Sequence, residues 1–294
     1  MRNIVASDYD GTLNQGGISA DTVEMIQKLQ AEGHLFGIVT GRDYSGGFQL
    51  FKREKRFPFD FIISHNGAVA YDQEGNILFS QFLNGSMEWR GSTLVQELIR
   101  ICLEMTGNPC GVAFERLKLN FHPDSLSEGK GDISAYSPIS VLQDIIEFNL
   151  ANALCDTPER AGQIVEALKK EFGNLINPVQ NGRCIDISPG GVDKSTGIAH
   201  YAEIMNVPLS NIWTVGDNYN DISMLRNYHG CAMASGVESA AQVAEHICDN
   251  VGDVIKIILN QKVSKIESQN LEDQGLEITR NHINKFSESD AKVF

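Results

Sequence analysis

The chain has 294 residues, 42% hydrophobic and 21% charged, a composition typical of a globular protein with one large or two smaller domains. Its formal net charge of −14 argues against nucleic acid or an anionic membrane as a partner. There is no apolar run of the roughly 18 residues that a membrane span needs, and six scattered cysteines form no Cys-x-x-Cys pair, so we expect a cytoplasmic protein without a signal peptide and with reduced thiols.

The N-terminal segment begins with the apolar run 4–6, which predicts a buried strand, and continues into Asp8, Asp10 and Gly11. Side chains that follow a strand of an open α/β sheet lie where such proteins bind ligands. Two neighbouring carboxylates repel each other unless a cation joins them, and a partly open site with oxygen ligands suits Mg²⁺. Because Asp and Gly are also common in simple turns, this interpretation needs partners from elsewhere in the chain.

The next 70 residues predict a strand–helix–strand unit, a third strand and a hairpin. The apolar residues between 18 and 33 recur at helical spacing, Ser19 or Asp21 can cap that helix, and Gly33 can end it. The second strand ends in Thr40-Gly41-Arg42, of which Arg42 is typical of a structural or rim residue. The predicted strands are 35–39 and 59–64, followed by hairpin strands 69–71 and 77–79.

From about residue 83 to about residue 183 the pattern changes. Helical periodicity alternates with short strand-like runs, and Thr157-Pro158 opens a second helix. We therefore expect residues 83–183 to form an inserted α+β domain. The polar residues Glu115, Arg116, Lys118 and His122 within it are suited either to contact a substrate or to form a solvated face.

The first pattern then resumes, so we expect residues 1–82 and 184–259 to form one discontinuous core domain. The predicted elements are a strand at 184–188, a helix that begins near Lys194, strands at 211–216 and 231–234, a short helix after 221, and closing helices at 237–247 and 251–259. Residues 260–294 form a polar tail for which a helix, a docked segment and disorder are all open.

Polar side chains follow the predicted strands at four places and are suited to phosphoryl transfer. These are Asp8 with Asp10, Thr40 with Gly41, Lys194, and Asp217 with Asn220 and Asp221. In a parallel sheet with right-handed crossovers, such strand ends lie along one edge. On this reading Asp8 attacks phosphorus, and Asp10 protonates the leaving alkoxide and then activates water.

The remaining groups supply positive charge and hydrogen-bond donors. Mg²⁺ held by Asp8 and Asp217 would offset the negative charge that the nucleophile and the phosphate share. Thr40 and the N–H that follows it would bind phosphate oxygens, and Lys194 would give a fixed cation. A lysine at the start of a helix is electrostatically unfavourable, which fits a functional site, although a solvated surface lysine is the alternative.

Together, Asp8–Thr12, Thr40–Arg42, Lys194 and Gly216–Asp221 resemble, in order and spacing, the four motifs of the haloacid dehalogenase superfamily. Ser64–Ala68 and the long insertion before the lysine are similar to its Cof-type sugar-phosphatase branch. The resemblance covers about residues 1–259. It implies an α/β fold with a doubly wound, Rossmann-like parallel-sheet core and an inserted α+β cap, Mg²⁺ dependence, and dephosphorylation of small phosphorylated metabolites.

The same resemblance implies that Asp10 binds Mg²⁺ through its backbone carbonyl and that Asn220 contacts the phosphate. It leaves open whether Asp221 binds the metal directly or through another group. A phosphomutase or other phosphotransferase would share every motif, and a phospho-receiver or regulator would use the same acidic pocket. Asp10 argues against a receiver, because it is expected to hydrolyse the aspartyl-phosphate.

Overall fold

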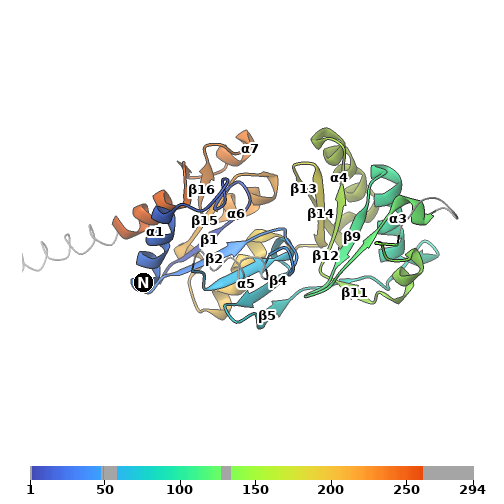
Figure 1. Ribbon diagram of the computed structural model, residues 1–294, viewed down its shortest axis with the longest axis horizontal. Coiled ribbons are helices and arrows are strands. Elements are labelled where there is room, and N and C mark those ends of the chain that lie inside the picture. The colour runs from blue at the N-terminus through green and yellow to red at the C-terminus, as the bar shows by residue number, and fades with distance from the viewer. Residues whose placement is uncertain (1, 48, 50–57, 127–133, 261–294) are drawn as a thin grey trace, which may run out of the picture.

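The structure, a computed structural model, describes residues 2–47, 49, 58–126 and 134–260. These residues form two lobes, each built on a β-sheet (Figure 1). The larger sheet has the strand order β17-β16-β15-β1-β2-β3-β4-β5, and the smaller one has the order β10-β9-β12-β14-β13. No helix in the described part of the chain is both long and apolar enough to cross a bilayer.

The larger sheet confirms the predicted parallel core. Its strands are β1 (Ile4–Ser7), β2 (Leu35–Val39), β3 (Phe61–Ser64), β4 (Val69–Asp72), β5 (Ile77–Ser80), β15 (Ile212–Gly216), β16 (His229–Met233) and β17 (His246–Cys248). The strands from β17 to β3 run parallel, and β4 and β5 form the predicted antiparallel hairpin. Because β1 lies between β2 and β15, the carboxyl ends of these three strands are neighbours at one edge of the sheet.

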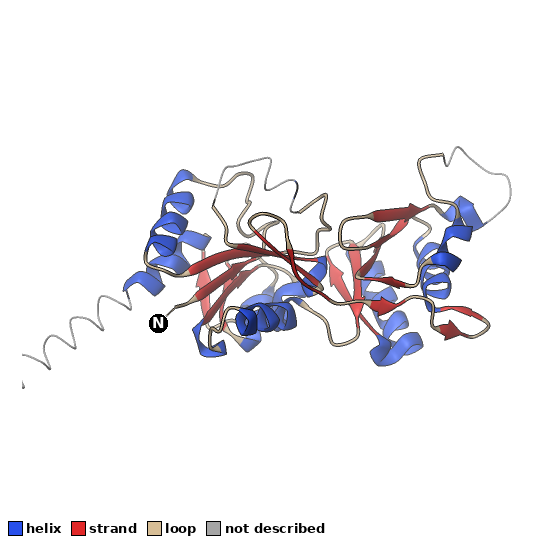
Figure 2. Ribbon diagram, turned by 90° about the horizontal axis from the view of Figure 1, so that it is seen from below, coloured by secondary structure: helices blue, strands red, loops and turns tan. Residues whose placement is uncertain are grey.

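Helices cover both faces of the larger sheet, as a doubly wound fold requires (Figure 2). Helix α1 (Ala20–Ala31) and the helical residues 251–260 pack on one face, and α5 (Lys194–Ile204) and α6 (Ile222–Asn227) pack on the other. The alternation of side chains along β1 supplies both cores, since Val5 belongs to the first and Ile4 and Ala6 to the second.

The smaller sheet is antiparallel throughout, and helices cover one of its faces. Its strands are β9 (Cys110–Ala113), β10 (Lys118–Phe121), β12 (Leu150–Leu154), β13 (Ile176–Asn181) and β14 (Cys184–Pro189). Helices α3 (Leu94–Thr106) and α4 (Pro158–Phe172) pack against the apolar face of this sheet. Two short ribbons complete the lobe, β6 (Leu83–Asn84) with β11 (Glu147–Phe148) and β7 (Glu88–Trp89) with β8 (Ser92–Thr93).

Helix starts follow the capping residues in the sequence. Ser19 Oγ accepts a hydrogen bond from the N–H of Thr22 at 3.1 Å and so begins α1. Thr157 caps α4 with a proline in its first turn, as predicted. The carboxylate of Asp193 accepts from the N–H of Thr196 at 2.8 Å, so α5 begins at residue 194.

Two sequence predictions are wrong in this region of the fold. The strand at 184–188 was expected in the parallel core, but β14 pairs with β12 and β13 in the smaller sheet because a two-residue turn, Gly182-Arg183, joins it to β13. The helix expected at 237–247 shrinks to α7 (Glu238–Ala241), because the chain then adds β17 to the edge of the larger sheet. The other domain limits stay predictions, and residues from 261 onward lie outside the described part.

Candidate active site

Three carboxylates meet at the carboxyl ends of β1 and β15. One oxygen from each of Asp8, Asp217 and Asp221 lies within 4.8 Å of the others. Asp8 directly follows β1, and its N–H donates to the carbonyl of Val215 at 2.8 Å, which holds it beside β15. The predicted meeting of these strand ends is therefore confirmed for the three side chains.

Lys194 joins two of these carboxylates. Its side chain is fully buried, and Nζ donates to Asp8 Oδ1 and to Asp221 Oδ1, both at 2.6 Å. Burial alone would lower the pKa of this lysine, but Asp221 and Asp8 raise it above its ordinary value. Lys194 is thus a fixed cation inside the site and not a surface residue.

The cluster carries more negative than positive charge. Burial raises the pKa of Asp8 to about 8; Asp221 and Asp217 add to the rise and Lys194 opposes it. Burial also raises the pKa of Asp217, although Thr12 Oγ1 donates to its carboxylate at 2.6 Å. Three carboxylates face one ammonium group here. The carboxylates offer hard oxygen ligands, and a divalent cation such as Mg²⁺ would neutralise their excess negative charge.

Both carboxylate oxygens of Asp221 accept hydrogen bonds from other groups of the protein. Oδ2 accepts hydrogen bonds from the N–H groups of Asp217 and Asn218, both at 3.0 Å, while Oδ1 accepts from Lys194. Asp221 is completely buried. It therefore fixes the loop that carries Asp217.

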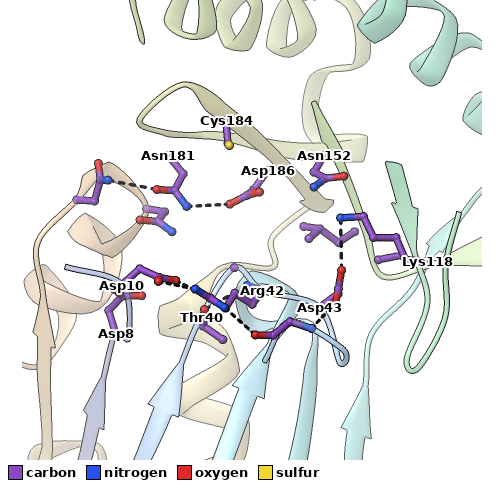
Figure 3. Close-up of a pocket in the computed structure, with 16 residues that line it drawn as sticks. Asp8, Asp10, Thr40, Arg42, Asp43, Lys118, Asn152, Asn181, Cys184 and Asp186 are labelled. Atoms are coloured by element: carbon purple, nitrogen blue, oxygen red, sulfur yellow. Dashed lines mark hydrogen bonds and ion pairs between the residues drawn. The ribbon is translucent and has the colours of Figure 1, made fainter. Parts of the chain in front are cut away.

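Asp10 lies apart from these three side chains. Arg42 Nε donates to Asp10 Oδ2 and Arg42 Nη2 to Asp10 Oδ1, both at 2.7 Å (Figure 3). Arg42 is held in turn by the carbonyl of Gly46 at 2.9 Å. The Asp10 side chain is 55% exposed, so the pair lies at the rim of the site. The carboxylate of Asp10 is not part of the three-carboxylate cluster.

Thr40, Gly41 and Asn220 line a cavity of about 250 Å³ next to Asp8 and Asp10. The N–H of Thr40 donates to the carbonyl of Ile63 at 2.8 Å, which keeps this buried threonine at the end of β2. The structure therefore brings the predicted phosphate-binding residues to the same edge as the carboxylates.

The opposite wall of the cavity comes from the smaller sheet (Figure 3). Its polar lining residues are Lys118, Asn152, Asn181, Cys184 and Asp186. Among the four polar residues selected from the sequence of this lobe, only Lys118 lines the cavity. The site is thus shared between the two lobes.

Asp186 is a polar residue of this cleft that was not selected from the sequence. Asn66 Nδ2 donates to Asp186 Oδ2 at 3.3 Å, and Asn220 Nδ2 donates to Asn66 Oδ1 at 3.3 Å, so Asn66 links the phosphate side to the opposite wall. Asp186 lies in the alternating run Cys184–Ser188, where Ile185 and Ile187 point to the core of the smaller lobe. This alternation was the available signal that Asp186 faces the other way.

Comparison with known families gives one match over most of the chain. The sequence profile of the haloacid dehalogenase-like hydrolases matches residues 5–258. A phosphatase from Bacillus subtilis, the 5-amino-6-(5-phospho-D-ribitylamino)uracil phosphatase YitU, is 23% identical over 254 residues, which are 82% of this chain and 90% of that protein.

Solved structures share the same fold. A HAD/COF-like hydrolase from Plasmodium vivax has a TM-score of 0.68 and 21% identity, covering 88% of this chain and 96% of that one. The HAD subclass IIB sugar phosphatase BT4131 has a TM-score of 0.68 and 19% identity, covering 87% and 98%. At these identities the likeness shows the fold alone.

Proposed function

The chain belongs to the haloacid dehalogenase-like hydrolases, and we propose that it is a Mg²⁺-dependent phosphatase that hydrolyses a small sugar phosphate through an aspartyl-phosphate on Asp8. The observation that carries this proposal is the cluster of Asp8, Asp217 and Asp221, joined by a buried lysine at 2.6 Å from two of them. Hydrolysis of a phosphomonoester through a covalent intermediate uses such a nucleophile beside fixed positive charge.

Asp8 and Asp217 are the side chains that would hold Mg²⁺, with the backbone carbonyl of Asp10. The excess negative charge that contributes to the raised pKa of Asp8 supports a cation there. When bound, Mg²⁺ supplies the charge that lets a phosphate approach a carboxylate. We assign Asp221 a positioning role, because its oxygens already accept from Lys194 and from two backbone N–H groups.

Asp8 is oriented for attack through one of its oxygens. Lys194 binds Oδ1, whereas no described residue donates a hydrogen bond to Oδ2. In the proposed first step Oδ2 forms a bond to phosphorus as the bond between phosphorus and the ester oxygen breaks. In the second step water attacks phosphorus, which releases phosphate and restores the carboxylate of Asp8.

Asp10 is the proposed acid and base. It gives a proton to the leaving ester oxygen in the first step and takes one from the attacking water in the second. Because Arg42 binds both of its oxygens here, Asp10 must exchange at least one of these hydrogen bonds to reach the substrate. Thr40, the N–H of Gly41, Lys194 and Asn220 are proposed to bind the phosphate oxygens, which their place along the cavity supports.

The substrate class is supported by cavity size and by the named relatives. A cavity of about 250 Å³ suits a small metabolite and not a macromolecule. The B. subtilis relative is named for a phosphorylated ribityl compound, and one structural neighbour is a sugar phosphatase. All six cysteines are free thiols, which agrees with the cytoplasmic location that we expect.

The proposal is tested by phosphate release from a panel of sugar phosphates and from p-nitrophenyl phosphate, with Mg²⁺ and with a chelator. We expect release only with Mg²⁺, and we expect Asp8→Asn to lower it by at least about 10³-fold while thermal unfolding stays cooperative. Near-wild-type release by Asp8→Asn would overturn the assignment of the nucleophile. Phosphate transfer to another sugar hydroxyl, without net release, would indicate a phosphomutase.

A further inference from the structure

The face of the smaller sheet that α3 and α4 leave uncovered extends beyond the first cavity. A second cavity of about 400 Å³ adjoins it on the same face. Lys118, Asn152 and Cys184 line both cavities. A ligand that enters the first cavity can therefore continue over the sheet into the second.

A polar row crosses this face, with one residue from each of four strands. Asn152 of β12 pairs with Asp186 of β14 on one side and with Gly111 of β9 on the other, and Gly111 pairs with Asn120 of β10. We call Asp186, Asn152, Gly111 and Asn120 the polar row. Because neighbouring strands lie about 4.8 Å apart, the row spans three spacings, roughly 14 Å.

The near end of the polar row lies beside the phosphate-binding loop. A Cβ atom on Gly41 would lie 2.8 Å from Asp186 Oδ2, so this carboxylate is in close contact with the loop. Asp186 is buried, and its hydrogen bonds come from two amides, Asn66 at 3.3 Å and Asn181 at 3.5 Å. The row therefore starts where the leaving group of a bound phosphate ester would begin.

The far end of the row offers amides without protein partners. A Cβ atom on Gly111 would lie 2.7 Å from Asn152 Oδ1 and 2.9 Å from Asn120 Oδ1, so both amides extend over this glycine. Within the described residues, neither side-chain amide has a hydrogen-bond partner. Their donors and acceptors are open to a ligand in the two cavities.

Charge along the row disfavours a second anion. Asp186 forms no salt bridge in the described part of the chain, and Lys118, the cation that lines both cavities, lies 3.4 Å from the carboxylate of Asp43, which offsets its charge. A second phosphate or carboxylate on the substrate would face Asp186, whereas hydroxyl groups can donate hydrogen bonds to it.

We propose that the polar row binds the leaving group of the substrate, and that this group is uncharged, rich in hydroxyl groups and longer than one sugar ring. Asp186 and Asn152 contact the unit that carries the phosphate, and Asn120 contacts the next unit in the second cavity. This inference rests on the proposed phosphatase function for the position of the phosphate.

The test measures binding to Asp8→Asn protein with Mg²⁺ by titration calorimetry, so that turnover does not interfere. Cellobiose 6′-phosphate and glucose 6-phosphate differ by one sugar unit, and we expect at least tenfold tighter binding of the longer ester. Sorbitol 6-phosphate and 6-phosphogluconate differ by one terminal carboxylate, and we expect at least fivefold weaker binding of the acid. Equal or weaker binding of the longer ester, or tighter binding of the acid, overturns the proposal.

Variants locate the preference on the row. Asn120→Ala should weaken the binding of cellobiose 6′-phosphate at least fivefold more than the binding of glucose 6-phosphate. Asp186→Asn should reduce the discrimination against 6-phosphogluconate. Asn174→Ala is the matched control, since Asn174 is an exposed asparagine of the same lobe that lines neither cavity. Equal effects of Asn120→Ala and Asn174→Ala would contradict the assignment.

Binding and turnover separate this inference from the proposed function. The same substrate ratios, measured as kcat/KM of the wild-type protein, decide the case if Asp8→Asn does not fold. Hydrolysis without a length preference would support the phosphatase function and overturn the assignment of the polar row as its specificity surface. A length preference in binding without hydrolysis of any ester would support ligand binding by the polar row and overturn the phosphatase function.

Discussion

Arg42 binds both carboxylate oxygens of Asp10, with N–O distances of 2.7 Å each. The two residues follow different strands, β1 and β2, and meet only because these strands are neighbours in the larger sheet. The proposed acid and base is thus oriented by a residue from the second motif. Arg42 is a positioning residue in this arrangement.

Replacing Arg42 should therefore affect esters that need a proton on the leaving group. We expect Arg42→Gln to lower kcat for a sugar phosphate about tenfold and kcat for p-nitrophenyl phosphate less, because nitrophenolate leaves without protonation. Arg42→Lys should not restore kcat fully, since lysine cannot bind both oxygens in a fork. Steady-state kinetics with both esters checks this, with Arg100→Gln, on the surface of α3, as control. An equal loss with both esters would instead indicate that Arg42 binds the phosphate.

Lys194 should contribute strongly to stability because it is fully buried between two carboxylates. We expect Lys194→Met to lower the free energy of unfolding by about 3–5 kcal/mol, since it leaves two buried carboxylates without their cation. The double variant Lys194→Met/Asp221→Asn should recover part of this loss. Urea unfolding in the presence of a chelator measures both, and strictly additive losses would contradict the coupling.

Mg²⁺ should stabilise the folded protein by binding to Asp8 and Asp217. At about 100 times its dissociation constant, a ligand that binds only the folded state adds about 2.7 kcal/mol, so we expect Tm to rise by roughly 5 °C. Asp217→Asn should lose most of this rise, whereas Asp21→Asn, an exposed carboxylate of α1, should keep it. Thermal unfolding at several Mg²⁺ concentrations is the measurement. The same rise in Asp217→Asn as in wild type would exclude Asp217 as a ligand.

Asp186 should make stability depend on pH. Burial raises its pKa from 3.8 to about 6, so the folded protein holds this proton more tightly than the unfolded chain does. The resulting stabilisation is complete below pH 3.8 and is lost as pH rises through about 6, with a magnitude of up to about 3 kcal/mol.

Asp186→Asn should remove this part of the pH dependence, because the amide is neutral throughout. The difference in the free energy of unfolding between wild type and Asp186→Asn, measured with urea from pH 4 to pH 7, isolates it. Asp144 is an exposed carboxylate of the same lobe, so the free energy of unfolding of Asp144→Asn should depend on pH in the same way as that of wild type. If the free energy of unfolding of Asp186→Asn and of wild type depended on pH in the same way, ionisation of Asp186 would not reduce the stability of the folded protein.

Local patterns predicted the parts of the fold on which the candidate site is built. Apolar runs identified β1, β2, β3 and β15, and the rule that parallel strand ends share an edge brought Asp8, Asp217 and Asp221 together. The sequence also predicted a helix that begins near Lys194, where α5 begins. The catalytic roles of these residues stay predictions until the variants are measured.

The remaining features depend on contacts between distant segments. Nothing near Arg42 in the sequence indicates that Asp10 is its partner, and the exposure of Asp186 to the cleft depends on which sheet β14 joins. The periodicity of residues 237–247 is compatible with a helix, but it does not indicate that His246–Cys248 pairs with β16. Tertiary pairing overrode the local pattern there.

The turn at Gly182-Arg183 also determines where the two lobes can be separated by recombination. A chimera joined at residue 184 would take β13 and β14, which pair along six residues, from different parents, so side chains that pack together in the smaller lobe would no longer match. A junction between Pro189 and Val192 transfers the smaller sheet whole and keeps Asp193 and Lys194 with the larger lobe. Exchange of substrate preference between relatives by domain grafting should therefore succeed at the second junction and yield destabilised protein at the first.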